Sequence, residues 1–124
     1  MNLLRYKIIY NSKLIRKVEN YFAKLKRSPF PSYIPAMVWD GNEVHVRGTW
    51  IGQTMLNHEL IHLAQINQVG FRQYLNKYFI EEKDIPYGEK ETEVEAYMHQ
   101  HNPRYLTDVY GLIPILEDEI YEQL

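Results

Sequence analysis

The chain has 124 residues, no cysteine and a formal net charge of −2. This length predicts one domain spanning 1–124. The charge gives no electrostatic basis for binding nucleic acid or an anionic membrane surface, and the absence of thiols excludes disulfides and cysteine metal ligands. We find neither a signal-peptide pattern nor an apolar run of membrane-spanning length, so we expect a cytoplasmic protein.

The N-terminal part predicts a strand and then a helix. "LLRYKIIY" at 3–10 has the aliphatic and aromatic content of a short strand, although it could also begin a helix. A helix follows over 12–27, where Ser12 is a suitable N-terminal cap and apolar residues recur along one stripe. Three prolines within 29–35 end this helix and predict a rigid loop.

A β-hairpin is predicted over 36–48. Apolar residues flank "DGN" at 40–42, where glycine is available for a positive φ. In the second strand of this hairpin, His45 and Arg47 share one face of the sheet.

Three further helices are predicted in the second half of the chain. The first covers about 49–69 and ends at Gly70, which suits a left-handed C-terminal cap. Apolar residues at helical spacing predict the second over 71–80, and the third carries "EKETEVEAYMHQ" at 89–100 and stops before Pro103.

The C-terminal tail, 104–124, ends in an acidic stretch that we expect to be helical. Taken with the hairpin and the helices, the chain predicts an α+β fold, in which a short sheet packs on the helix over 49–69 and on the other helices.

The stretch "HELIH" at 58–62 carries the main functional signal. His58 and His62 lie four positions apart, so on a helix both imidazoles project from one face and can reach a single zinc ion. Glu59 is rotated by about 100° from His58 and can instead act on a water bound to the metal. A chance occurrence of this motif has a probability of roughly two per cent, and two buried histidines without a partner would be costly.

A catalytic zinc site needs a third protein ligand and an open position. The candidates follow the motif in "ETEVEAYMHQH": Glu91, Glu93, Glu95, His99 and His101. For Glu91, a favourable charge at a helix N-terminus is a sufficient explanation. His99 and His101 suit either a helix C-terminus or the stabilisation of an oxyanion.

"HELIHLAQ" followed by a helix with "EVEAY" resembles the gluzincin zinc metallopeptidases. In its small size and in the order helix, hairpin, motif helix and glutamate helix, the chain resembles the minigluzincins in particular. In related families the second signature often reads E-x-x-A-D, with its first glutamate as the ligand. The resemblance therefore implies Glu93 as the third ligand and Ala96 as the small residue that lets two helices approach. Tyr97 stands where the pattern has an aspartate that supports a ligating histidine, and Glu95 is the alternative ligand.

This resemblance implies a zinc-dependent peptidase that acts on a peptide or protein substrate, with Zn²⁺ as cofactor and Glu59 as general base and acid. His45 and Tyr97 are candidate substrate contacts. The reason for His45 is that such enzymes use the strand before the motif helix, on which His45 lies, as a rim to which an extended substrate adds. Two alternatives stay open. One is a non-catalytic binding protein on a zincin scaffold with a structural zinc, and the other is a latent peptidase whose tail, 104–124, regulates it by filling the cleft.

Overall fold

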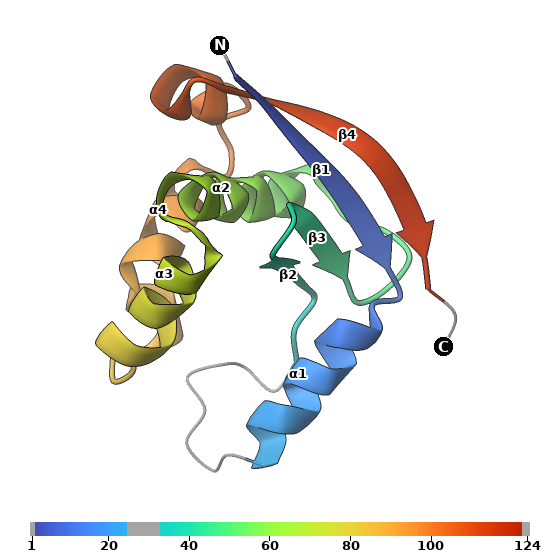
Figure 1. Cartoon of the computed structure of the whole chain (residues 1–124), viewed down its shortest axis with the longest axis vertical. Helices are drawn as coiled ribbons and strands as arrows, with labels where there is room; N and C mark the ends of the chain where they lie inside the picture. Colours follow the sequence, from blue (N-terminus) through green and yellow to red (C-terminus); the bar gives the residue numbers. More distant parts are fainter. Residues whose placement is uncertain (1, 25–32, 123–124) are drawn as a thin grey trace.

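The computed structural model describes residues 2–24 and 33–122 and has an α+β fold, as predicted (Figure 1). The main elements are β1 (Asn2–Tyr10), α1 (Lys13–Lys24), β2 (Ala36–Trp39), β3 (Glu43–Val46), α2 (Gln53–Val69), α3 (Phe71–Asn76), α4 (Glu91–His99) and β4 (Leu112–Tyr121). Three short helical turns complete the chain: η1 (Lys77–Glu81), η2 (Tyr87–Glu89) and η3 (Leu106–Tyr110). None of the helices within 2–24 and 33–122 is both long and apolar enough to cross a membrane.

The four strands form one mixed sheet in the order β2-β3-β1-β4. β1 is parallel to both of its neighbours, and β2 pairs antiparallel with β3. The predicted N-terminal strand is therefore confirmed as β1. Side chains alternate across its two faces, and one face is buried in the core: Leu4, Tyr6, Ile8 and Tyr10.

The predicted hairpin is also confirmed. Val38 of β2 pairs with Val44 of β3, and the turn between them places Gly41 and Asn42 at φ values of 84° and 59°. Glycine adopts this region without steric cost and asparagine tolerates it better than most residues, so the local sequence determines this turn.

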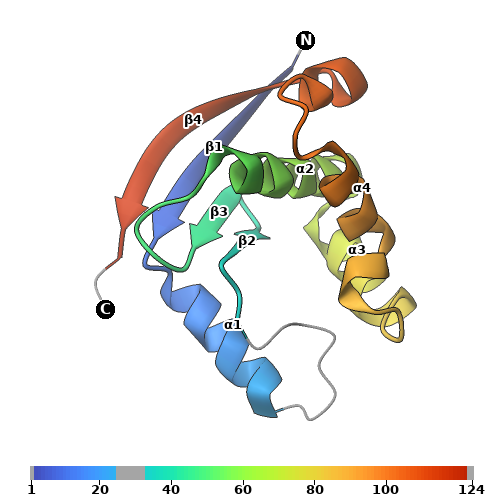
Figure 2. The same ribbon diagram turned by 180° about the vertical axis from the view of Figure 1, so that it is seen from behind.

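α1 begins where the sequence predicts, because the Ser12 hydroxyl accepts a hydrogen bond from the backbone N–H of Ile15 at 3.3 Å. The helix lies beyond the ends of β1 and β4 (Figure 2). The last residues of the predicted helix and the first prolines after it, within 25–32, lie outside the described residues.

α2 is the central helix of the fold. Nine consecutive residues, 58–66, are buried, which confirms a helix packed on more than one side. The helix starts at Gln53, four residues later than the predicted start at Thr49, and the chain between Gly48 and Gly52 is not helical. It ends at Val69, as predicted. Gly70 follows with φ 90° and ψ 151°, a conformation that favours glycine but is not the left-handed helical cap that was predicted.

The acidic stretch of the tail is a strand and not a helix, so this prediction was wrong. Residues Leu112–Tyr121 form β4, which runs parallel to β1 along nearly its whole length (Figure 1). Pro114 disfavours a helix interior but is tolerated on an edge strand, and β-branched residues suit a strand better than a helix. The partner of this strand is β1, at the other end of the chain, so the local sequence did not reveal the pairing.

Candidate metal centre

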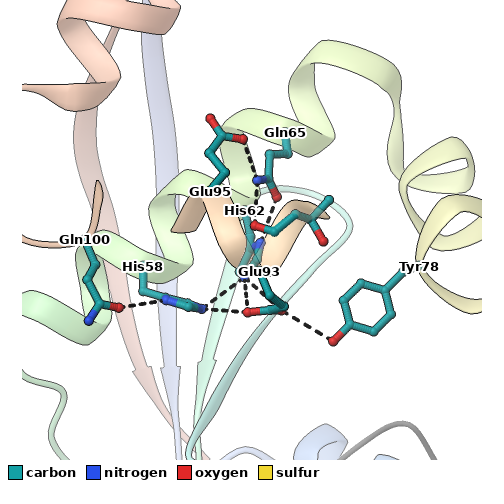
Figure 3. A network of polar contacts seen from close by, with 8 residues as sticks. His58, His62, Gln65, Tyr78, Glu93, Glu95 and Gln100 are labelled. Carbon is teal, nitrogen blue, oxygen red and sulfur yellow. Dashed lines mark hydrogen bonds and ion pairs between the residues drawn. The ribbon is translucent and has the colours of Figure 1, made fainter. Parts of the chain in front are cut away.

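The structure brings three of the predicted ligand residues together (Figure 3). Nε2 of His58 lies 3.0 Å from Oε1 of Glu93, and Nε2 of His62 lies 3.1 Å from Oε2 of the same carboxylate. One candidate ligand atom from each residue falls within 4.8 Å of the others, and all three residues are buried. Two ligands therefore come from α2 and one from α4, close enough to hold a single metal ion.

The imidazoles are held by their second nitrogen atoms. Nδ1 of His58 is 2.9 Å from Oε1 of Gln100, and Nδ1 of His62 is 2.8 Å from Oε1 of Gln65. An amide oxygen only accepts hydrogen bonds, so each Nδ1 carries the proton. These hydrogen bonds orient both rings so that their Nε2 atoms lie towards Glu93, from where they can ligate a metal ion.

The pKa values of Glu93 and His62 are shifted in opposite directions by their contact with each other. Burial alone would raise the pKa of Glu93, but the contacts of this carboxylate with His58 and His62 outweigh burial and lower the pKa to about 2. Burial alone would lower the pKa of His62, but its contacts with Glu93 outweigh it and raise the pKa to about 9. A proton on His62 balances the carboxylate, and a metal ion would replace that proton.

Glu59 differs from the other acidic residues of the site. Its side chain is 6% exposed and lines the same cleft, and Oε2 has no hydrogen-bond partner among the described residues. Burial raises the pKa of this carboxyl, while His62 and His58 oppose the rise. A buried carboxylate oxygen without a partner is costly unless the site supplies one, and a water held beside it would do so.

The donor set fits zinc. Two imidazoles and one carboxylate, with no thiolate, form a ligand set that catalytic zinc sites use, in which the fourth position stays open to water or substrate. The cleft next to these residues has a volume of about 1400 Å³, and the walls contain His58, Glu59, His62 and Glu93. The residues present therefore suit a zinc ion that is accessible from the cleft.

The structure separates Glu93 from the other carboxylates of α4. Glu95 accepts hydrogen bonds from Gln65, Tyr105 and Tyr110 at 2.6–2.8 Å and does not join the cluster. Glu91 is exposed and pairs with Lys77 at 2.8 Å. Of the three candidates, only Glu93 reaches the two histidines.

The remaining histidine candidates of α4 and its C-terminal end lie away from the cluster. His99 stacks on Tyr105 with ring centroids 4.0 Å apart, and His101 is exposed. Neither lines the cleft. Tyr97 does line it, and its ring packs against His58 with centroids 4.5 Å apart. It thus contacts the histidine through its ring, where the family pattern has a carboxylate.

His45 lies away from the cleft. Its Nδ1 is 2.6 Å from the Ser12 hydroxyl and its Nε2 is 2.9 Å from Oε1 of Glu43, so the buried ring links β3 to the start of α1. Both edges of β3 are paired, to β2 and β1, which leaves no edge for an extended substrate. Among the described strands, the edge next to the cleft belongs to β2, all of whose residues line it. A substrate contact by His45 stays a prediction.

Three residues near the ligands were not predicted from the sequence. Gln65 follows His62 by three positions, and the helical i, i+3 spacing was a usable signal for it. Gln100 approaches His58 from beyond the end of α4, and the Tyr78 hydroxyl lies 3.4 Å from Oε2 of Glu93. These two contacts depend on how separate elements pack, and no local pattern indicates them.

The tail does not fill the cleft in the described part of the chain. No residue beyond Gln100 lines it, and β4 lies at the far edge of the sheet. A regulatory role for the tail stays a prediction, but it cannot operate through this arrangement by occupying the cleft.

Comparisons of the chain with protein-family models, with curated proteins and with solved structures found no match. The resemblance to gluzincins therefore depends on the two sequence motifs and on the meeting of His58, His62 and Glu93.

Proposed function

We propose that this protein is a zinc-dependent metallopeptidase in which His58, His62 and Glu93 hold the metal. The observation that carries the proposal is the position of Glu59, a buried carboxylate that has an unpaired oxygen and lines the cleft beside the three ligands. A site that served only to stabilise the fold would have no use for such a group, because an unpaired buried carboxylate lowers stability.

The chemistry follows from the positions of these side chains. Zinc, when bound, acts as a Lewis acid that lowers the pKa of a water ligand towards about 7 and polarises the substrate carbonyl. The carboxylate of Glu59 would accept the proton of the attacking water and then donate it to the amine of the leaving peptide. In the metal-free protein burial raises the pKa of Glu59, and a carboxyl with a raised pKa is a better proton donor near neutral pH than an ordinary one.

We infer that the substrate is an extended stretch of polypeptide. Among the described strands β2 lies at the edge of the sheet, and the residues Ala36–Trp39 line the same cleft as Glu59. An added strand would pair with this edge and pass beside the site.

A non-catalytic zinc protein is the alternative. Structural zinc sites usually have four protein ligands and are closed to solvent. The described residues supply three ligands beside an open cleft, which favours the catalytic proposal.

The test is hydrolysis of an unfolded protein by the zinc-loaded chain, measured with and without a chelator. A variant with His58→Ala and His62→Ala serves as the control. We expect about one zinc per chain in the parent, none retained by the variant after dialysis, and cleavage by the parent alone. Zinc binding without cleavage of varied unfolded substrates would favour the binding protein, and equal zinc retention in the variant would refute the site.

A further inference from the structure

A chain of hydrogen bonds leads from the cluster of His58, His62 and Glu93 to the C-terminal segment. Figure 3 shows its first part, from His62 through Gln65 to Glu95. It begins at Nδ1 of His62, which donates to Oε1 of Gln65 at 2.8 Å. Nε2 of Gln65 donates to the backbone carbonyl of Thr92 at 3.0 Å and to Oε1 of Glu95 at 2.8 Å. The buried amide of Gln65 is therefore engaged through both its oxygen and its nitrogen, which fixes its orientation.

Glu95 continues the chain from Gln65 to two tyrosines. Its Oε2 accepts hydrogen bonds from the hydroxyls of Tyr105 at 2.6 Å and Tyr110 at 2.7 Å. Tyr105 immediately precedes η3 and Tyr110 is its last residue, so the two tyrosines attach this turn to Glu95. β4 starts two residues later and extends the same segment along β1.

Each link restricts the next. An imidazole ring that donates to a fixed acceptor keeps one tautomer and one orientation, and loss of such a support typically weakens metal binding by about 10–100-fold. Gln65 is a fixed acceptor only because Glu95 and the Thr92 carbonyl hold its amino group, and Glu95 is held in turn by two phenols.

We propose that Gln65 and Glu95 are positioning residues through which the docking of η3 sets the zinc affinity of the site. By thermodynamic linkage, zinc binding must stabilise the docking of η3 by the same factor. The C-terminal segment thus acts on the candidate ligands through Glu95 and Gln65, and its described residues do not line the cleft. This proposal depends on the zinc site of the proposed function but does not require peptidase activity.

The first experiment removes the two hydroxyls and keeps both rings. We expect a variant with Tyr105→Phe and Tyr110→Phe to bind zinc about tenfold or more weakly than the parent in competition with a chromophoric chelator. Tyr10→Phe is the matched control, because Tyr10 donates to Oε1 of Glu119 at 3.0 Å, in the sheet and outside the cleft. This control should stay within about twofold of the parent. Equal affinity in all three proteins would overturn the proposal.

The second experiment tests whether the hydrogen-bond chain itself matters, as distinct from packing. Gln65→Glu replaces an amino group 2.8 Å from Glu95 with a carboxylate oxygen, and the two charges should repel and weaken zinc binding. Adding Glu95→Gln removes the repulsion and restores a donor and an acceptor between the two side chains. We expect this exchange to recover most of the lost affinity, and the absence of any recovery would contradict the proposal.

The third experiment measures the linkage directly. Hydrogen exchange of the backbone amides within 105–110 should slow when zinc is added to the parent and should change much less in the variant that lacks both tyrosine hydroxyls. If the parent binds zinc and exchange within 105–110 does not respond, the positioning proposal fails while the metal site stands. If the parent binds no zinc at all, the proposed function fails first.

Discussion

Replacing Glu59 with glutamine separates catalysis from stability. The substitution keeps the length and shape of the side chain and removes only the charge and the ability to move a proton. Because Glu59 is not one of the three clustered ligands, the zinc content of the variant should match that of the parent. Hydrolysis should fall by about 10²–10⁴-fold, which is the usual contribution of a general acid–base group.

The stability of the metal-free variant should not decrease. Glu59 is 6% exposed and Oε2 has no partner among the described residues, so its charge opposes folding. A buried polar group without a partner costs about 1–3 kcal/mol, and a neutral amide recovers part of that cost. We therefore expect the free energy of unfolding to rise by zero to about 2 kcal/mol, which corresponds to at most roughly 10 °C in Tm for a domain of this size.

The two measurements are made on the same preparations. Thermal unfolding is followed on chelator-treated protein, and cleavage of an unfolded substrate is followed after loading with one equivalent of zinc. Glu91→Gln is the matched control, since Glu91 is exposed and pairs only with Lys77 in the described structure. Undiminished hydrolysis in Glu59→Gln would refute the mechanism, and a loss of more than about 1 kcal/mol of stability would refute the view that this carboxylate is unpaired.

Further predictions concern the ligands and pH. Glu93→Gln should weaken zinc binding more than Glu95→Gln, because Glu93 contacts both histidines and Glu95 acts only through Gln65. A larger loss of zinc affinity in Glu95→Gln, measured by competition with a chelator, would make Glu95 the third ligand. Burial lowers the pKa of His62, but its contacts with Glu93 raise the pKa by more, to about 9, so this ring carries an additional proton near neutral pH. Zinc binding should therefore release a proton, measurable in weakly buffered solution, and the zinc affinity should fall as the pH is lowered. For the metal-free protein, Glu93 has a pKa below its ordinary 4.5 and His62 a pKa above its ordinary 6.5. The stability from Glu93 is therefore lost as the pH falls from about 4.5 towards 2, and that from His62 is lost as the pH rises from about 6.5 towards 9, so Tm should be highest between these ranges.

The parts that the sequence predicted correctly depend on neighbours along the chain. The spacing of His58 and His62 places both rings on one helical face whatever surrounds the helix, and the turn at Gly41 follows from the backbone freedom of one residue. The Ser12 cap is equally local, because its partner is the amide three residues later. Such features need no knowledge of the fold, since the interacting groups are close in the sequence.

Residues that meet only through folding were predicted incompletely. Glu93 and Glu95 have similar positions in the sequence, and a family pattern was needed to choose between them; in the structure one meets the histidines and the other faces Gln65 and two tyrosines. The rotation of α4 against α2 makes this choice, and helix packing is set by all the side chains at the contact.

The sequence by itself determined the α+β class, the N-terminal strand, the hairpin and a motif helix with two histidines and a glutamate suited to a metal site. Only the tertiary structure decided the strand at the C-terminus, the burial of His45 away from the cleft and the hydrogen bond between His58 and Gln100. β4 pairs with β1 across more than a hundred residues of sequence, and a parallel pair has no turn of its own that a local pattern could reveal. The environment of a side chain is likewise a property of the packed core and not of its own segment.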